Sequence, residues 1–465
     1  MNIKQAKQEI TNTLKAYLAK DQLGNYLIPT VRQRPVLLMG PPGVGKTQIM
    51  EQIAAETGVG LVAYTITHHT RQSAIGLPFI EKRTYGGEEV SVTEYTMSEI
   101  LSSVYRLMER TGLQEGILFL DEINCVSETL APMMLQFLQC KTFGNQALPE
   151  GWLIVAAGNP PEYNKSVRDF DVVTLDRVKR IDVEEDYGVW KEYARRKNLH
   201  GAIRSYLDIK KDNFYRIENT ADGLQFATAR GWEDLSELLY AYETLGIRAD
   251  REVVGQYIQM PRIAKDFANY LEMFYKYQKT YHVEGILSGT WENITVLELR
   301  EAPFDEKLSV MGLVLSRLSE EARNTRCQDA LADALHTSLT EFREKIADAP
   351  PLTVLDQLLW KRRTAMKQAK EAGQLDKESR DLKQREINAL EDYRQQLDRE
   401  AVAPEGAMDA VRGWFGEEVE RRKAMAMETK DMFDNAFRFL ETTFGDSQEL
   451  VIFVTEITAG YDTSW

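Results

Sequence analysis

Residues 40–47 read Gly40-Pro41-Pro42-Gly43-Val44-Gly45-Lys46-Thr47, and this stretch decides the fold. It fits the pattern G-x-x-x-x-G-K-[ST], in which glycines let consecutive backbone N–H groups curl around phosphate oxygens. The lysine can reach the same oxygens, and the threonine hydroxyl can ligate Mg²⁺. The pattern therefore predicts that residues 40–47, with Gln48 directly after them, bind the phosphates of a nucleotide.

The flanking residues predict a strand before this loop and a helix after it. Val36-Leu37-Leu38-Met39 is an unbroken apolar run, as expected for a strand that a parallel sheet buries on both faces. After Thr47, apolar residues recur at helical spacing until Gly58. The phosphates would then lie at a helix N-terminus, where free N–H groups and the helix dipole favour an anion.

A second apolar run, Gly116–Leu120, ends in the paired carboxylates Asp121 and Glu122. Ligands of open parallel sheets bind at the carboxyl ends of the strands. At that edge Asp121 would hold Mg²⁺, and Glu122 would act as the general base toward the water that attacks the γ-phosphate. The alternative is a strand that ends in two solvated acids.

A third apolar run, Trp152–Ala157, is followed by Gly158-Asn159-Pro160-Pro161. We expect Asn159 to stand at the same sheet edge, where its amide could orient the attacking water. The alternative is an ordinary turn, since Asn before Pro is common in turns.

The order of these motifs resembles that of the AAA+ ATPases, and more narrowly the MoxR branch. The resemblance covers residues 30–245. It includes three short motifs, Asp-Glu-Ile-Asn at 121–124, Gly-Asn-Pro at 158–160 and Gly-Leu-Pro at 76–78. It also includes two hairpins that are expected in this branch. We expect the first hairpin through Tyr85–Glu88 and the second over Lys141–Leu148, turning at Gly144-Asn145.

The resemblance implies roles for three arginines. Arg177, in Leu175-Asp176-Arg177, matches the arginine finger that one subunit donates to the nucleotide of its neighbour, and Arg180 competes for that role. Arg230 matches sensor 2 of the helical lid. Val178 stands where a Phe more usually follows the finger. The alternative for each arginine is a surface side chain in a loose ion pair.

The resemblance also implies a function and partners. The chain would be an ATPase with ATP and Mg²⁺ as its ligands. It would assemble into a homo-oligomeric ring, expected to be a hexamer, and would remodel a client protein in a chaperone-like way. A partner with a von Willebrand A domain is expected from the family alone. Two alternatives stay open: a nucleic-acid-stimulated motor of a restriction or defence type, and a nucleotide-binding scaffold with negligible turnover. The phosphate loop does not distinguish ATP from GTP.

Composition narrows the class of protein. With 465 residues the chain is too long for one core, and a net charge of −15 gives no basic footprint, which disfavours a nucleic-acid partner. We see no apolar stretch of ~18–20 residues, so we expect no membrane span. Three cysteines without metal-ligand spacing indicate a reducing compartment, and we expect the cytoplasm.

The predicted fold class is α/β: a P-loop, AAA+ parallel-sheet core with a helical lid, then a mainly α-helical C-terminal domain. We expect the core at residues 1–190, the lid at 191–280 and the C-terminal domain at 281–465. Within the last part, Thr295–Leu299 predicts a short strand. Lys377–Glu400 predicts a long polar helix with a thin apolar stripe. That helix either forms a coiled-coil arm for a partner or packs on its own domain.

Overall fold

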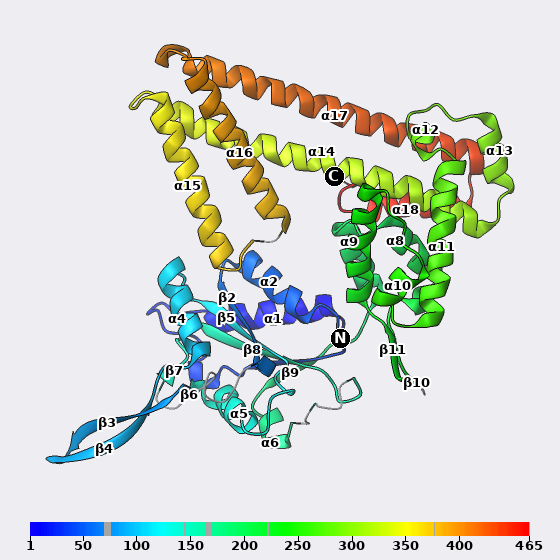
Figure 1. Ribbon diagram of the computed structural model, residues 1–465. Coiled ribbons are helices and arrows are strands. Elements are labelled where there is room, and N and C mark those ends of the chain that lie inside the picture. Colours follow the sequence, from blue (N-terminus) through cyan, green and yellow to red (C-terminus); the bar gives the residue numbers. More distant parts are fainter. Residues whose placement is uncertain are drawn as a thin grey trace. The chain divides into compact units, whose positions relative to one another are not determined.

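The computed structural model describes residues 1–68, 76–143, 146–163, 167, 170–220, 223–375 and 377–464. It divides into two compact units (Figure 1). The first contains Met1–Glu185 and Arg363–Arg380, and the second contains Asp186–Arg362 and Asp381–Trp465. Among the described residues, no helix combines the length and the apolar character that crossing a membrane requires.

A five-stranded parallel sheet forms the centre of the first unit, with the strand order β2-β5-β8-β1-β9. The three strands predicted before the sequence motifs are confirmed, and β1 lies between β8 and β9. The register pairs Val36 of β1 with Val155 of β8 and Lys179 of β9. The strands are β1 (Val36–Met39), β2 (Gly60–Thr65), β5 (Gly116–Asp121), β8 (Trp152–Gly158) and β9 (Lys179–Asp182).

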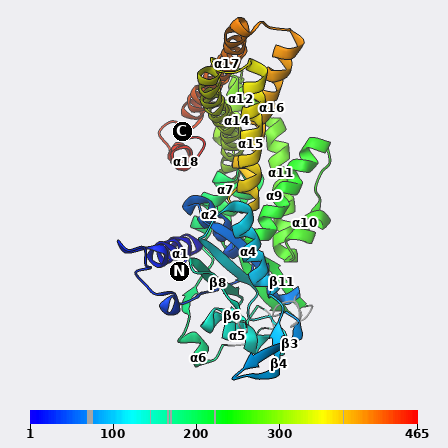
Figure 2. The same cartoon turned by 90° about the vertical axis from the view of Figure 1, so that its left-hand side faces the viewer.

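Helices cover both faces of this sheet (Figure 2). Helices α1 (Ile3–Leu18) and α2 (Lys46–Thr57) pack on one face, and α4 (Glu99–Thr111) and α5 (Ala131–Cys140) pack on the other. Alternate residues of each strand serve the two hydrophobic clusters because strand side chains point to opposite faces in turn. The predicted doubly covered parallel core is confirmed.

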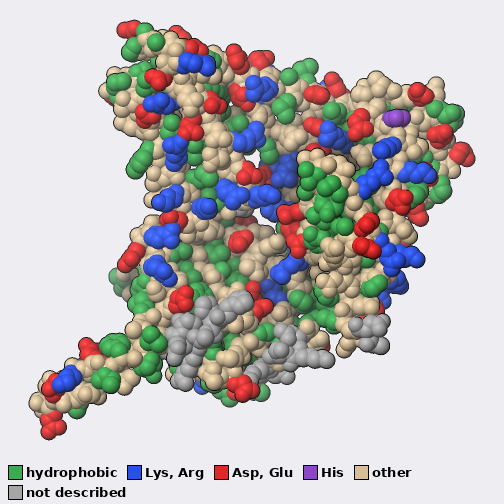
Figure 3. All heavy atoms as spheres, in the orientation of Figure 1, with side chains coloured by type: hydrophobic (Ala, Val, Ile, Leu, Met, Phe, Trp, Pro, Cys, Tyr) green, Lys and Arg blue, Asp and Glu red, His purple; other side chains and the backbone are tan. Residues whose placement is uncertain are grey.

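Both expected hairpins are present as antiparallel strand pairs. Strands β3 (Pro78–Tyr85) and β4 (Glu88–Tyr95) form the longer one, which projects from the core with exposed hydrophobic side chains along it (Figure 3). Strands β6 (Thr142–Phe143) and β7 (Gln146–Ala147) form the shorter one. Its predicted turn at Gly144-Asn145 lies outside the described residues.

The second unit is almost entirely helical. Its longest members are α14, with 42 residues, and α17, with 38, so α14 spans about 63 Å at 1.5 Å per residue. One short hairpin, β10 (Arg216–Thr220) with β11 (Gly223–Ala227), interrupts the helices. The helices with residues in this unit are α7 (Tyr187–Arg196), α8 (Gly201–Ile209), α9 (Ala229–Leu245), α10 (Arg251–Tyr257), α11 (Pro261–Thr280), α12 (Val283–Leu287), α13 (Asn293–Glu301), α14 (Phe304–Lys345), α15 (Pro351–Glu371, ending in the first unit), α16 (Lys377–Arg399, beginning in the first unit), α17 (Ala407–Phe444) and α18 (Gln448–Ala459).

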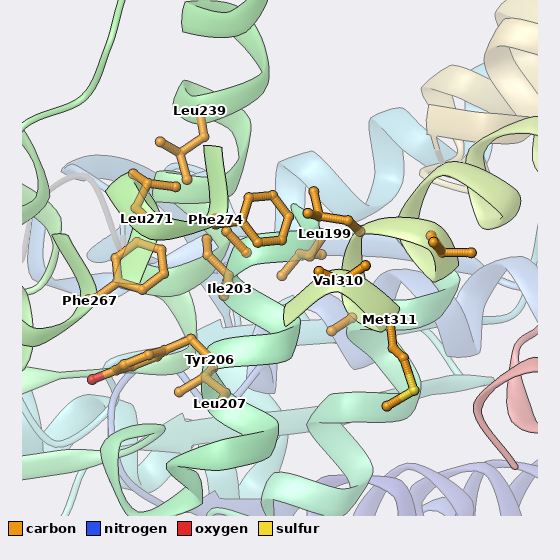
Figure 4. Close-up of a cluster of buried hydrophobic side chains, with 14 of the residues drawn as sticks. Leu199, Ile203, Tyr206, Leu207, Leu239, Phe267, Leu271, Phe274, Val310 and Met311 are labelled. Atoms are coloured by element: carbon orange, nitrogen blue, oxygen red, sulfur yellow. The ribbon is translucent and has the colours of Figure 1, made fainter. Parts of the chain in front are cut away.

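A large hydrophobic cluster joins most helices of this second unit, although α15 and α16 contribute no buried residue to it (Figure 4). It joins α8, α9 and α11 to α14, so helices on both sides of residue 280 share a core. Helices α8 and α14 cross closely through small residues. A Cβ on Gly201 would lie 2.6 Å from Ser316 Oγ, and one on Gly312 would lie 2.9 Å from Ser205 Cβ. Larger side chains at these two glycines would push the helices apart.

Two expectations for the C-terminal part are resolved by packing. The strand expected at Thr295–Leu299 is wrong, because these residues belong to helix α13. Val296 and Leu299 are buried three residues apart, which is the spacing of one helix face, while Ile294 and Leu297 are exposed. The long polar helix is confirmed as α16, and its stripe packs on the chain's own helices, with Ile387, Leu390, Tyr393 and Leu397 all buried.

Candidate nucleotide-binding site

The phosphate loop connects the carboxyl end of β1 to the first residue of α2. Gly43 has φ +75° and Gly45 has φ +93°, a left-handed backbone that side chains with a Cβ rarely adopt. A Cβ on Gly40 would lie 2.8 Å from the carbonyl oxygen of Val183, so this position also requires glycine. Helix α2 begins at Lys46 without a side-chain cap on its N-terminus. The N–H groups and the dipole at such a helix N-terminus favour an anion.

Lys46 lies inside this loop and is only 8% exposed. Its Nζ donates hydrogen bonds to the carbonyl oxygens of Gly40 (2.8 Å) and Pro41 (2.9 Å) and to Oδ1 of Asn159 (2.9 Å). The predicted phosphate-binding lysine and the predicted water-orienting amide are therefore in direct contact, although 113 residues separate them in the chain. The ammonium group supplies positive charge at the centre of the loop.

The two predicted magnesium ligands also meet. Thr47 Oγ1 donates a 3.0 Å hydrogen bond to Oδ2 of Asp121, which ends β5. A hydroxyl and a carboxylate oxygen at this distance are donors of the type that Mg²⁺ binds in nucleotide sites. The donor set and the glycine loop thus fit a magnesium nucleotide. When bound, the ion would neutralise charge on the phosphate oxygens.

Glu122 has a strained backbone and a fixed side chain. Its φ of +57° is left-handed, which is uncommon for a residue with a Cβ and is typical of functional sites. Its N–H donates to Oδ1 of Asp121 at 2.9 Å. Its Oε2 accepts a 2.9 Å hydrogen bond from the hydroxyl of Thr67, which follows β2. The sequence reasoning missed Thr67; the only available signal is its place just after a strand that pairs with β5.

Asn124 fixes the position of Asn159. It is 3% exposed, its Nδ2 donates to the carbonyl oxygen of Asn159 at 2.8 Å, and its Oδ1 accepts from the N–H of Asn159 at 3.3 Å. A Cβ on Gly158 would lie 2.6 Å from Asn124 Oδ1, which explains the glycine before Asn159. Sequence reasoning used Asn124 only as part of a motif and gave it no role.

Arg177 lies at the other edge of the sheet. Lys179 pairs with Val36 at the amino end of β1, whereas the phosphate loop follows Met39 at its carboxyl end. Three residue steps along a strand separate these ends by about 10 Å, and Arg177 lies further back still. Its side chain is exposed, and its Nη1 donates to Oε1 of Gln139 on α5.

The neighbours of Arg177 differ from it in exposure and in partners. Val178, which replaces the more usual Phe, is 4% exposed and belongs to the hydrophobic cluster on the α4 and α5 face. Arg180 lies within β9 and forms a 2.8 Å ion pair with Asp182.

Arg230 belongs to the second unit, where it is exposed in the first turn of α9. The structure therefore gathers Lys46, Thr47, Asp121, Glu122 and Asn159 at one site, without Arg177.

One family model matches the part of the chain that holds this site. Residues 35–178 match the family model described as AAA domain (dynein-related subfamily). A solved structure of a candidate ATPase from Cytophaga hutchinsonii is similar at 18% identity, with a TM-score of 0.23. That similarity covers 39% of this chain and 52% of the other, so the chain spans about half the length of that protein. The chain has no match among curated proteins. The family match, the sheet order and the site together support an AAA+ ATPase domain at residues 35–178.

Proposed function

We propose that this chain is an ATP-hydrolysing AAA+ ATPase of the MoxR type, which works as a ring and remodels a client protein. One observation carries the hydrolytic part: five side chains from three separate segments converge where a parallel sheet ends beside a glycine-rich loop. They are Lys46, Thr47, Asp121, Glu122 and Asn159. The alternative, a strand that ends in two solvated acids, does not explain why a buried lysine, a pair of possible metal ligands and a glutamate with a left-handed backbone occur together.

Each of these residues has a role that its contacts support. The loop N–H groups and Lys46 would bind the phosphates of ATP, and Thr47 and Asp121 would hold Mg²⁺. Glu122 would accept a proton from the attacking water once its carboxylate leaves the hydroxyl of Thr67. Asn159, held through its backbone by Asn124, would orient that water.

The test of hydrolysis is Glu122→Gln. The variant keeps the loop and the metal ligands, so it should bind ATP with unchanged affinity. It removes the general base, and such a base contributes about 10²–10⁴ in rate, so phosphate release should fall by a similar factor. Lys46→Ala is the matched control, because it should lose binding as well. Wild-type turnover in the Glu122 variant would overturn the mechanism.

The ring, the client and a partner with a von Willebrand A domain rest on the resemblance to the MoxR branch. The position of Arg177 supports a ring, since an arginine at the amino edge of the sheet suits the nucleotide of another copy better than its own. Capture of client proteins on ATP-loaded Glu122→Gln tests the remodelling role. A strong rise in the ATPase rate with DNA or RNA would instead favour a nucleic-acid motor.

A further inference from the structure

A cavity of about 380 Å³ lies within the second unit, and none of the residues given a role in the nucleotide site lines it. Its walls come from α7, α8, α14 and α18. One side is apolar and is formed by Leu308, Met311 and Leu315 of α14 and Ile452 of α18. Its size is within the range of small-molecule sites, which run from about 300 to 1,000 Å³.

The other side of the cavity carries an excess of positive charge. Four cations line it (Lys191, Arg195, Arg204 and Lys211) against two acids (Asp208 and Glu456), so the formal charge is 4 − 2 = +2. Both acids are already engaged. Lys191 Nζ lies 2.6 Å from Asp208 and 2.7 Å from Glu456, and Arg195 also pairs with Glu456.

These pairs leave two cations over, Arg204 and the exposed Lys211, and Arg204 is the more buried of the two. Its Nε is buried and has no hydrogen-bond partner, and no ion pair to Arg204 occurs within the described ranges. Burial lowers the pKa of its guanidinium from the ordinary value, which shows that the surroundings disfavour the charge. A buried donor without a partner is unfavourable by about 1–3 kcal/mol, more for a charged group. A bound ligand is one way in which such a group is satisfied.

We propose that this cavity binds a small organic anion, with a phosphate or carboxylate head against Arg204 and a compact apolar body against the α14 wall. The excess charge selects an anion, and the buried Nε supplies a donor that the fold leaves unused. The apolar wall favours a ligand with a hydrocarbon body over an inorganic ion. This site is independent of the proposed ATPase activity.

The experiment uses the full chain carrying Lys46→Ala, so that the phosphate loop does not contribute to binding. Isothermal titration calorimetry with phenyl phosphate and with benzoate identifies the preferred head, and inorganic phosphate and benzyl alcohol test the head and the body alone. We expect one of the two organic anions to bind, and Arg204→Gln to weaken it at least about tenfold, the equivalent of ~1.4 kcal/mol. Arg317 lines a separate cavity and pairs with Glu320, so Arg317→Gln should leave the binding affinity unchanged.

Equal affinity in the Arg204→Gln and Arg317→Gln variants, or no binding of either organic anion, would overturn the proposal. Thermal unfolding without ligand adds a second readout. Arg204→Met should be at least as heat-stable as the parent, because it removes a buried donor, Nε, that has no partner. A clearly lower Tm would instead assign Arg204 to the packing of α8 and contradict a binding role.

Discussion

At the scale of single residues, the contact between Thr67 and Glu122 determines what the proposed general base can do. The carboxylate has to leave this hydroxyl before it can accept a proton from water, and here it is directed toward the end of β2. Thr67→Val removes the donor and keeps the shape. A hydrogen bond to a charged group contributes ~1.5 kcal/mol, so we expect basal phosphate release to rise about tenfold. Thr67→Ser, which keeps the hydroxyl, should restore the wild-type rate. A lower rate in Thr67→Val would show that the threonine supports the base.

Lys141 gives a prediction about alkaline pH. It ends α5, is 8% exposed, and donates one 2.9 Å hydrogen bond to the carbonyl oxygen of Thr30. Burial lowers its pKa from 10.5 to about 8. Between these two values the unfolded chain holds a proton that the folded chain has lost. The free energy of unfolding contributed by Lys141 therefore rises with pH across that window, by about 1.4 kcal/mol per unit.

Lys141→Met should remove this dependence. Denaturant unfolding at pH 7 should give the variant a higher free energy of unfolding than wild type, because the buried ammonium destabilises the wild-type fold at this pH. At pH 10 the two free energies of unfolding should no longer differ in this way. The control is Lys20→Met, since Lys20 is exposed and its pKa is raised by its hydrogen bond to Glu115. A constant difference between Lys141→Met and wild type across this pH range would contradict the prediction.

These residues also mark the limit of prediction from the sequence. The sequence identifies the phosphate loop because its chemistry is local: glycines, a lysine and a hydroxyl lie within eight positions. It identifies Asp121 because this acid directly follows an apolar run. Thr67, in contrast, acquires its role from the pairing of β2 with β5, and Asn124 from the approach of β5 to β8. Neither contact has a signature at short range, so only the folded sheet identifies them.

At the scale of elements, the apolar pattern of the sequence predicts strands correctly where both faces of the sheet are buried. It fails where contacts with distant helices decide between strand and helix. The apolar runs of β1, β5 and β8 matched their strands because both faces of a parallel sheet are buried. Thr295–Leu299 looked like a strand through its Thr and Val, yet the cluster of the second unit takes up Val296 and Leu299 from one helix face.

A buried polar network fixes α14, α15 and α16 to one another. Glu386 on α16 is 8% exposed; its Oε1 accepts from Ser338 Oγ of α14 at 2.6 Å and lies 3.0 Å from Nε of Arg362 on α15. Glu386→Ala would leave a largely buried guanidinium without this partner. We expect a loss of roughly 3 kcal/mol in the free energy of unfolding, measured by urea denaturation. Asp398→Asn, at an exposed 4.0 Å pair, should stay within about 0.5 kcal/mol. Equal effects of the two changes would show that the network does not hold the helices.

At the scale of the whole molecule, Arg177, the expected arginine finger, does not belong to the site at the carboxyl edge of its own sheet. The carboxyl edge gathers the phosphate loop, the metal ligands and the base, while Arg177 lies beyond the amino ends of β1 and β9. An arginine that reaches the transferred phosphate is worth about 10³–10⁵ in turnover. If Arg177 has this role, the guanidinium has to come from a second copy, and hydrolysis then depends on assembly.

Mixing two inactive variants tests this dependence. Arg177→Ala keeps nucleotide binding without the finger, and Lys46→Ala keeps the finger without nucleotide binding, so each alone should be nearly inert. In an equal mixture of exchanging subunits, half of the sites bind nucleotide and half of those face an intact finger, which predicts about a quarter of the wild-type rate. Replacing the second variant by the Lys46→Ala, Arg177→Ala double variant should abolish the recovery. Arg180→Ala separates the two candidates for the finger. If Arg177 is the finger, Arg180→Ala alone should keep the wild-type rate, because Arg180 is paired with Asp182 in its own strand. If Arg180 is the finger, Arg180→Ala alone should be nearly inert and should recover when it is mixed with Lys46→Ala. No recovery in any mixture would place the two functions in one chain and remove the ring from the mechanism.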